Sequence, residues 1–308
     1  MGVGFVFPGQ GAQEVGMLDE LRFAEPILDD RLAAASEVLG FDLGDVIRNG
    51  PEERLSQTSV TQPALLSTSV ALFEIWTVHG GVAPSIMAGH SLGEYSAFTA
   101  AGSLQFSDAV KLVHERGKLM ESAVPDGEGA MAAILGLDDE LVSSICREIN
   151  GIVSPANMNA PGQVVISGES SAVDEATARC SESGARRSVR LNVSGPFHCD
   201  LMTPAAEELK NLLDEVEIKM PNVPVIHNVD ASLAVDPSGV RNCLVRQLSA
   251  PVRWSECVSA MLSAGATTIL ECGPGKVLTG LLRRIDRTAR AYSIGSVDEL
   301  SKALEETE

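Results

Sequence analysis

A serine flanked by two glycines is the first feature of this sequence that could do chemistry. The pentapeptide Gly89-His90-Ser91-Leu92-Gly93 follows a short apolar run and precedes residues that favour a helix. This pattern is typical of a strand-to-helix elbow, in which the turn is too tight for side chains beside the serine. Free N–H groups and the positive dipole end of the helix would favour the negative charge that forms on an attacked carbonyl. The pattern predicts a nucleophile at Ser91, with a glycine-bounded N-cap serine as the alternative interpretation.

A serine hydroxyl needs a base to take its proton, and imidazole is the usual base near neutral pH. Of the five histidines, His198 has the most suitable position, because it lies on a Gly-Pro loop that Pro196 stiffens. The other histidines have simpler interpretations as a helix cap, a loop brace, a surface side chain and a core side chain: His79, His90, His114 and His227, in that order. We therefore expect His198 to be the base.

The order of these residues along the chain differs from that of an ordinary α/β-hydrolase. That family places the serine first, then an acid, then a late histidine, whereas His198 lies in the middle of this chain. No acidic residue is obviously placed to orient it. The simpler hypothesis is a Ser-His dyad in which a backbone carbonyl or an amide orients the imidazole.

Arg116 is a cation that could hold a substrate carboxylate. It lies in a predicted helix and is followed by Gly117, which leaves space beside it. The planar guanidinium matches a carboxylate in a bidentate manner, but a buried arginine without an anionic partner is costly. From spacing alone, a solvated helix face shared with Glu115 and Lys118 is the favoured interpretation.

Strands and helices alternate around these residues. The pattern predicts strands at 4–7, 85–88, 223–228 and 267–272, and helices at 26–39, 62–78, 106–122, 204–216, 240–248, 255–264 and 277–284. This alternation is typical of an α/β fold with a parallel sheet. Such sheets bind substrates at the carboxyl ends of their strands, where Gln10, Ser91 and the loop at Gly273 are expected to lie.

A different alternation interrupts this pattern after residue 126. The residues that follow predict a strand at 130–135, a helix at 138–149, strands at 152–157 and 163–168, a helix at 171–183 and a strand at 187–193. The order β-α-β-β-α-β is that of a ferredoxin-like unit. We therefore expect a small subdomain at 127–193 inserted into a large α/β domain formed by 1–126 and 194–308.

Composition limits the classes of function. The chain has 308 residues, 44% of them hydrophobic, and a net charge of −19, which argues against nucleic acid as a partner because a phosphate backbone requires a basic face. The six cysteines are scattered without a Cys-x-x-Cys pair, so the spacing favours reduced core thiols over a zinc site or a disulfide framework. No apolar run has membrane-spanning length, and the N-terminus resembles no secretory or myristoylation signal. We expect a cytoplasmic protein without metal or cofactor.

Taken together, several segments resemble the malonyl-CoA:acyl carrier protein transacylases of bacterial fatty acid synthesis. The resemblance follows the order of the motifs over essentially the whole chain, at Phe7–Gln13, Gly89–Glu94, Arg116, Asn157–Gln163, Pro196–His198 and Gln247. It implies a hydrolase-like α/β core with an inserted ferredoxin-like subdomain, in agreement with the division expected from the alternation of elements.

The resemblance also implies a role for individual residues. Ser91 would be the nucleophile and His198 the general base and later acid, oriented by the main-chain carbonyl of Gln247. The backbone N–H groups of Gln10 and Leu92 would form the oxyanion hole, and Arg116 would bind the malonyl carboxylate. His90, Asn159 and Phe197 would line or shape the cleft. Leu92 and Phe197 resemble the malonyl-selective members, although many bacterial relatives carry a smaller residue in place of Phe197.

The mechanism implied is a ping-pong transfer from malonyl-CoA, through a malonyl-serine ester, to the phosphopantetheine thiol of acyl carrier protein. Two alternatives stay open at this point. One is a stand-alone polyketide-pathway acyltransferase or acyl hydrolase that uses the same residues, and the other is a catalytically silent scaffold that binds acyl carriers.

Docking of the acidic carrier protein requires a positive patch on an acidic chain. Two groups of arginines could supply it: Arg283, Arg284, Arg287 and Arg290 after the Gly273 loop, and Arg186, Arg187 and Arg190 near the last strand of the small subdomain. We expect one of these groups to dock the carrier, and an ordinary solvated surface is the alternative.

Overall fold

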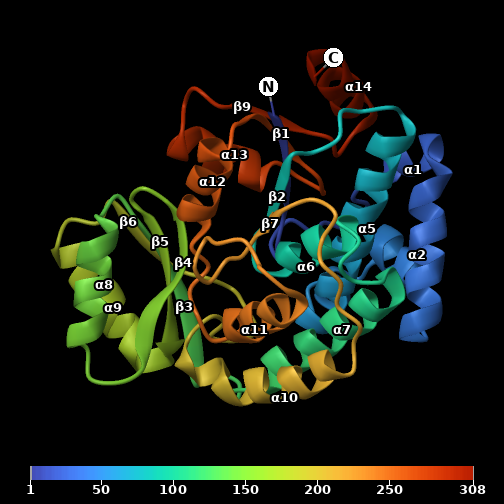
Figure 1. The fold of residues 1–308 in the computed structure, drawn as a ribbon. Coiled ribbons are helices and arrows are strands. Elements are labelled where there is room, and N and C mark those ends of the chain that lie inside the picture. The colour runs from blue at the N-terminus through green and yellow to red at the C-terminus, as the bar shows by residue number, and fades with distance from the viewer. Residues whose placement is uncertain (1, 308) are drawn as a thin grey trace.

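The large part of the molecule is built on a parallel five-stranded sheet. The computed structural model describes residues 2–307, and Figure 1 shows this sheet at the centre of the right-hand part. All four strand pairs are parallel, and the spatial order is β7 (Val225–Ile226), β2 (Ile86–Gly89), β1 (Gly2–Phe7), β8 (Ala266–Glu271) and β9 (Arg290–Ser293). The predicted parallel α/β architecture is confirmed.

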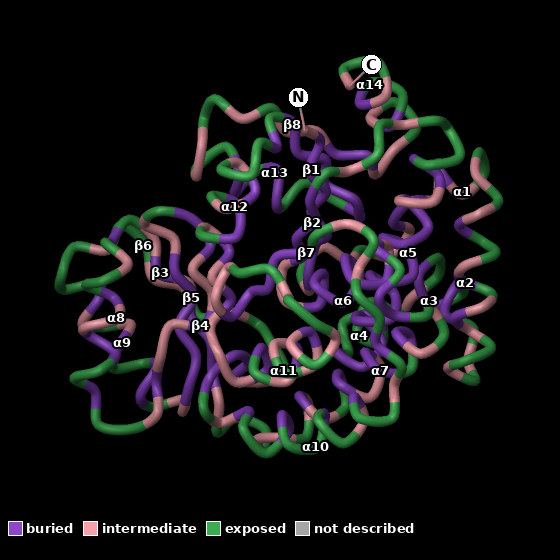
Figure 2. Tube along the Cα trace, in the orientation of Figure 1, coloured by how far each residue is buried: buried purple, intermediate pink, exposed green. Residues whose placement is uncertain are grey.

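The central strand β1 is buried on both faces. Phe5 and Phe7 pack on one side, against the cluster that contains α5, whereas Val6 packs on the other side, against α12 and α13. Alternate side chains of a strand point to opposite faces, so an apolar run such as Gly4–Phe7 indicates a sheet covered on both sides. Figure 2 shows the central strands β1 and β2 as buried.

Helices cover both faces of the sheet. Their bounds are α1 (Asp19–Ala24), α2 (Pro26–Leu39), α3 (Leu43–Asn49), α4 (Glu52–Leu55), α5 (Thr58–Val78), α6 (Leu92–Ala100), α7 (Phe106–Ser122), η1 (Asp200–Met202), α10 (Thr203–Asp214), α11 (Pro237–Gln247), α12 (Trp254–Ser263), α13 (Val277–Ile285) and α14 (Val297–Thr307). The short helices α1, α3 and α4 were not predicted, because each has seven residues or fewer and shows too little apolar periodicity.

The helix α5 begins at Thr58, four residues before the predicted start at Gln62. Pro63 therefore lies inside the helix and cannot donate an N–H to the carbonyl of Ser59. The ring of His114 supplies the missing donor, because its Nδ1 lies 2.6 Å from that oxygen. The prediction that His114 is a surface side chain is thus wrong: the ring is half-buried and joins α7 to α5.

A second sheet forms the small subdomain, at the left of Figure 1. Its elements are β3 (Gly129–Leu135), α8 (Asp139–Glu148), β4 (Val153–Ala160), β5 (Gln163–Glu169), α9 (Ser170–Glu182) and β6 (Arg187–Arg190). The strands are antiparallel, in the spatial order β4-β5-β3-β6. The predicted ferredoxin-like order is confirmed, and the bounds at 127 and 193 stay a prediction.

The two parts are joined by more than the connecting chain. In the loop before α12, Val252 donates its N–H to Ala156 at 2.8 Å and accepts from the N–H of Met158 at 2.9 Å. These bonds extend the edge of β4 onto the large part. Among residues 2–307, no helix combines the length and apolarity needed to cross a membrane.

Candidate active site

The turn between β2 and α6 has the geometry that the pentapeptide predicts. Ser91 adopts φ 51° and ψ −107°, a backbone conformation that L-residues rarely accept. A Cβ on Gly89 would lie 1.8 Å from the carbonyl carbon of Gly93, and a Cβ on Gly93 would lie 2.0 Å from the carbonyl oxygen of Phe7. A side chain at either position would clash, so both glycines are required. Gly93 packs directly against the carbonyl of Phe7 at the end of β1.

The structure brings Ser91 and His198 together across 107 residues of chain. The Ser91 Oγ lies 2.7 Å from Nε2 of His198, and Nδ1 of the same ring donates to the main-chain carbonyl of Gln247 at 2.8 Å. That bond assigns the hydrogen to Nδ1 and leaves Nε2 as an acceptor facing the serine. Burial, followed by the positive charge of Arg116, lowers the pKa of His198 to about 3. The ring is therefore neutral near pH 7.

Arg116 also lies beside the serine, with its Nη2 3.2 Å from Ser91 Oγ. The interpretation of a solvated helix face is wrong for this residue, because its side chain is only 1% exposed. Glu115 and Lys118 lie on the outer face of α7 and pair with each other at 2.8 Å. Gly117 allows this burial: a Cβ there would lie 2.5 Å from the Cα of Ser59 in α5.

Two amide oxygens, and no carboxylate, hold the guanidinium. Nη1 donates to Oε1 of Gln62 at 2.8 Å and Nη2 donates to Oε1 of Gln247 at 2.9 Å, while the Arg116 Cζ lies 5.2 Å from the centre of the Tyr95 ring. Among the residues that the structure describes, Arg116 forms no salt bridge, and its Nε has no hydrogen-bond partner. The positive charge is thus held in position without being neutralised.

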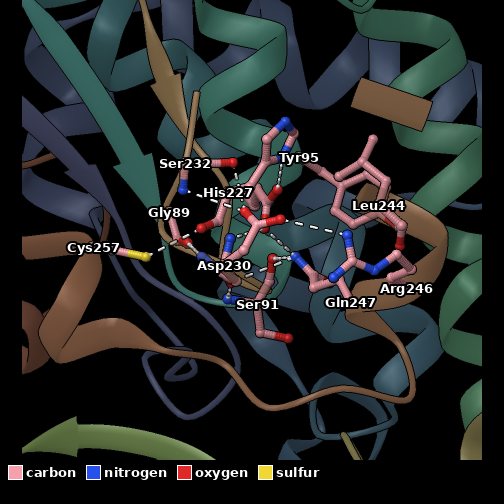
Figure 3. Close-up of polar contacts among 12 residues, drawn as sticks. Gly89, Ser91, Tyr95, His227, Asp230, Ser232, Leu244, Arg246, Gln247 and Cys257 are labelled. Atoms are coloured by element: carbon pink, nitrogen blue, oxygen red, sulfur yellow. Dashed lines mark hydrogen bonds and ion pairs between the residues drawn. The ribbon is translucent and has the colours of Figure 1, made fainter. Parts of the chain in front are cut away.

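Four buried residues, which we call the support network, lie behind Ser91: Glu94, His227, Asn228 and Gln247. Asn228 accepts the N–H of Ser91 at 2.7 Å and donates to the carbonyl of Gly89 at 2.7 Å, while the side-chain amide of Gln247 donates to the Ser91 carbonyl at 2.9 Å. Figure 3 shows Ser91, Gln247 and His227 within these polar contacts. These side chains bind both the N–H and the carbonyl of Ser91, and so hold its backbone in the rarely adopted conformation.

Sequence reasoning missed Asn228 and Glu94 as parts of the site. The predicted strand 223–228 is reduced to Val225–Ile226, because His227 and Asn228 turn away from the sheet to bond Glu94. The available signal was the polar pair His227-Asn228 at the carboxyl end of a predicted parallel strand. Active sites lie at that edge of such sheets, so the pair could have been predicted to belong to the site.

The two groups expected in the oxyanion hole lie at the ends of β1 and β2. Gln10 follows Pro8-Gly9, and Leu92 is the first residue of α6. Within residues 2–307, neither backbone N–H donates to a backbone carbonyl in a turn or cap. The Gln10 side chain bonds the Thr58 hydroxyl at 3.2 Å, which fixes the loop. Both N–H groups are free to bind an oxygen, and their role stays a prediction.

A cavity of about 430 Å³ opens onto these groups. Its lining includes Gln10, Ser91, Arg116 and His198 from the large part, and Met131 from β3. Phe197, His90 and Asn157 line it as well. Asn159 is not in the lining, and its Oδ1 accepts a hydrogen bond from His90 Nε2 at 2.8 Å. Burial lowers the pKa of His90. A neutral brace for the elbow is consistent with the predicted role of His90.

The two predicted arginine groups meet at one place on the surface. Five side chains, which we call the arginine hollow, line a depression of about 600 Å³: Arg186, Arg187, Arg283, Arg284 and Arg287. Arg190 points elsewhere and pairs with Asp174 at 2.9 Å, and Arg290 is outside the lining. The hollow therefore draws its charge from both parts of the molecule.

All six cysteines are free thiols, and five are buried. Among residues 2–307, no group of three histidine, cysteine, aspartate or glutamate side chains is arranged to hold a metal ion.

Comparison with known proteins agrees with this geometry. The model of the acyl transferase domain family matches residues 4–303. The malonyl CoA-acyl carrier protein transacylase of Escherichia coli K12 is 49% identical over 303 residues, which are 98% of each chain, and that of Bacillus subtilis is 44% identical over 98% of this chain and 96% of the relative.

Solved structures give the same result. The acyl carrier protein S-malonyltransferase of Vibrio cholerae has a TM-score of 0.96 and 48% identity, covering 98% of this chain and 99% of the other. A malonyl-transacylase in complex with its type II polyketide synthase acyl-carrier protein has a TM-score of 0.98 and 49% identity, covering 99% and 100%. The chain therefore belongs to the acyl transferase domain family and, within it, to the malonyl-CoA:acyl carrier protein transacylases.

Proposed function

We propose that this enzyme transfers the malonyl group of malonyl-CoA to the phosphopantetheine thiol of acyl carrier protein through an ester on Ser91. One observation carries the proposal. A buried guanidinium without a carboxylate partner lies 3.2 Å from a serine hydroxyl that is hydrogen-bonded to a neutral imidazole. A substrate with an acyl carbonyl and a free carboxylate a few atoms away would satisfy both groups.

In the first half-reaction, His198 Nε2 takes the hydroxyl proton while Ser91 Oγ attacks the thioester carbonyl. The developing oxyanion would accept hydrogen bonds from the N–H groups of Gln10 and Leu92, and loss of one such donor typically costs ~10²- to 10³-fold in rate. The carbon–sulfur bond then breaks, and the CoA sulfur leaves with the proton from His198. The product is malonyl-Ser91 with a neutral imidazole.

The second half-reaction reverses these steps with another thiol. His198 takes the proton of the phosphopantetheine thiol, and the sulfur attacks the ester carbonyl. The carbon–oxygen bond breaks, and Ser91 Oγ recovers the proton. The Gln247 carbonyl keeps Nδ1 protonated throughout, so that Nε2 is the only ring atom that exchanges a proton.

Arg116 would supply the preference for malonyl over neutral acyl groups. Desolvation makes a buried guanidinium costly unless an anion accompanies it. Because Gln62 and Gln247 offer only neutral oxygens, the substrate carboxylate would be the first full negative charge to pair with it. Phe197, which lines the same cavity, would limit the size of the acyl group.

We propose that acyl carrier protein docks on the arginine hollow. The chain carries a net charge of −19, so an acidic partner needs a local concentration of positive charge to approach. Five arginines in one depression supply that charge. The free thiols and the carrier-dependent reaction also support a cytoplasmic location.

Incubation with malonyl-CoA followed by intact mass spectrometry tests the proposal. We expect one malonyl adduct on the wild-type enzyme, located on Ser91, and none on Ser91→Ala. Arg116→Ala should lose malonyl transfer by roughly 10²-fold and accept acetyl relatively better, because the carboxylate loses a charge-assisted bond.

Three outcomes would contradict it. Absence of an adduct on folded wild-type enzyme would leave only a carrier-binding scaffold. Steady CoA release without an acceptor would indicate an acyl hydrolase. Equal losses for malonyl and acetyl in Arg116→Ala would show that Arg116 has only a structural role.

A further inference from the structure

Glu94 is a carboxyl group that could compete for Arg116. Its side chain is fully buried one turn after Ser91 in α6, and its charge is near enough to raise the pKa of Arg116, although burial outweighs this and lowers that pKa overall. Direct pairing would neutralise the guanidinium that the substrate carboxylate needs. The structure nevertheless shows no salt bridge between the two.

Gln247 separates the carboxylate from the guanidinium. Its Nε2 donates to Glu94 Oε2 at 2.7 Å and to the Ser91 carbonyl at 2.9 Å, so that Oε1 must face Arg116, which it does at 2.9 Å. The orientation of this amide is set by the acceptor on one side and the donor on the other. Glu94 thereby helps to position Arg116 without touching it.

His227 contacts the second carboxylate oxygen of Glu94. Its Nδ1 lies 2.7 Å from Oε1, and both side chains are fully buried. Burial lowers the pKa of His227, but the side chain of Cys243 and the carboxylate of Glu94 outweigh it and raise that pKa above its ordinary value of 6.5. The 2.7 Å contact between two fully buried side chains and the direction of the pKa favour an imidazolium paired with a carboxylate, although His227 Nε2 has no hydrogen-bond partner among residues 2–307.

We propose that His227 and Glu94 form an internally neutral ion pair that keeps the negative charge of Glu94 from Arg116 and so preserves the malonyl preference of the site. His227 is then a positioning and specificity-determining residue that touches neither substrate nor Ser91. Without its positive charge, Glu94 would present an uncompensated carboxylate behind Gln247. That charge would attract Arg116 and repel the malonyl carboxylate.

This inference rests on the proposed function, and three variants test it. In His227→Gln, an amide can still donate to Glu94 but the positive charge is lost. In Glu94→Gln, the amide oxygen can accept from Gln247 and Asn228 while its NH₂ group faces a neutral His227. The double variant Glu94→Gln with His227→Gln removes both charges.

The measured quantity is the ratio of kcat/KM for malonyl-CoA to that for acetyl-CoA. For His227→Gln we expect this ratio to fall about tenfold, mainly through a higher malonyl KM, because one buried charge is left unpaired. For Glu94→Gln and for the double variant we expect ratios within about twofold of wild type, because in each variant the side chains at positions 94 and 227 carry no net charge. A double variant as impaired as His227→Gln, or an unchanged ratio in folded His227→Gln, would overturn the proposal.

A readout that does not depend on activity accompanies these variants. Nitrogen-15 NMR of histidine-labelled enzyme, with the ring assigned by through-bond correlation, should find His227 doubly protonated near pH 7.5 in wild type and neutral in Glu94→Gln. A neutral His227 ring in wild type would overturn the proposal even if His227→Gln failed to fold. Failure of the proposed function is observed separately, as absence of malonyl-Ser91 in the wild-type enzyme.

Discussion

At the scale of single residues, the charge of Arg116 affects both the substrate and the base. Burial is the larger cause of the low pKa of His198, and the guanidinium adds to it. If a malonyl carboxylate pairs with Arg116 as proposed, the effect of the guanidinium on His198 would be cancelled, and the imidazole would become a stronger base as the substrate binds. In the proposed mechanism, the same arginine would couple recognition of the carboxylate to activation of the serine.

This coupling predicts a shift in pH dependence. His198 is active when neutral, and because its pKa is lowered to about 3, kcat/KM for acetyl-CoA should stay constant as the pH falls below 6.5. In Arg116→Ala, the pKa of His198 should rise, so that the acidic decline moves to higher pH. Profiles between about pH 4 and pH 8 measure this shift. Identical acidic declines in both proteins would show that Arg116 does not act on His198.

At the scale of elements, the site depends on close contacts between pairs of segments. The elbow touches the end of β1 through Gly93, and α7 touches α5 through Gly117, where a Cβ would lie 2.5 Å from backbone atoms of Ser59. The second contact sets how deeply Arg116 enters the core. A glycine in a helix normally costs stability, so its presence in α7 reflects this contact.

Replacement of Gly117 by alanine should destabilise the fold. We expect the free energy of unfolding to fall by about 1–3 kcal/mol, because the new methyl group meets backbone that cannot move aside cheaply. The matched control is Gly280→Ala in α13, where no atom lies within 4 Å of the added Cβ; it should stabilise by about 0.5–1 kcal/mol. Urea unfolding measures both, and equal effects at the two positions would contradict this account of the α5–α7 contact.

At the scale of the whole molecule, the cavity at Ser91 and the arginine hollow each combine residues of the two parts. The cavity takes Ser91 and Arg116 from the large part and Met131 from the small subdomain. The arginine hollow takes Arg186 and Arg187 from the small subdomain and the others from α13 and the loop after it. Because β3 runs from Gly129 to Leu135, one strand contributes to the cavity near its start and to the hollow at its end.

Charge reversal in the hollow should weaken carrier binding selectively. For Arg283→Glu with Arg284→Glu, we expect the KM for acyl carrier protein to rise about tenfold or more at low salt, while exchange of malonyl between CoA molecules is unchanged. The control Arg147→Glu with Arg179→Glu makes the same change of charge on the exposed faces of α8 and α9. An equal rise in KM for the control, or none for the first pair, would exclude the hollow as the docking site.

Much of the architecture follows from local sequence signals. The apolar runs at Gly4–Phe7 and Ile86–Ala88 end in glycine-rich turns, and they form the buried strands that were predicted. The change of alternation after residue 126 also identified the ferredoxin-like subdomain before its sheet was known. These signals are local, because hydrophobic periodicity and turn residues act over a few positions.

Local signals could not show whether an individual polar side chain is buried or exposed. Spacing placed Arg116 on a solvated face and His114 on the surface, yet both are bound by partners more than fifty positions away, Gln62 and Ser59. Resemblance to a family supplied a role for Arg116, but spacing did not. Burial of a polar side chain depends on whether a distant segment provides acceptors, and helical periodicity contains no information about that segment.

The sequence by itself determined the elbow at Ser91 and the change from a parallel to an antiparallel sheet, and its resemblance to a family supplied many of the site residues, but not Asn228 or Glu94. Only the tertiary structure decided that Ser91 and His198 approach to 2.7 Å, that two amide oxygens bind Arg116, that His227 contacts Glu94, and that two arginine groups form one hollow. The physical reason is the range of each interaction. Turns and periodicity are properties of neighbouring residues, whereas the pairing of buried charges is decided by segments that meet only when the chain is folded.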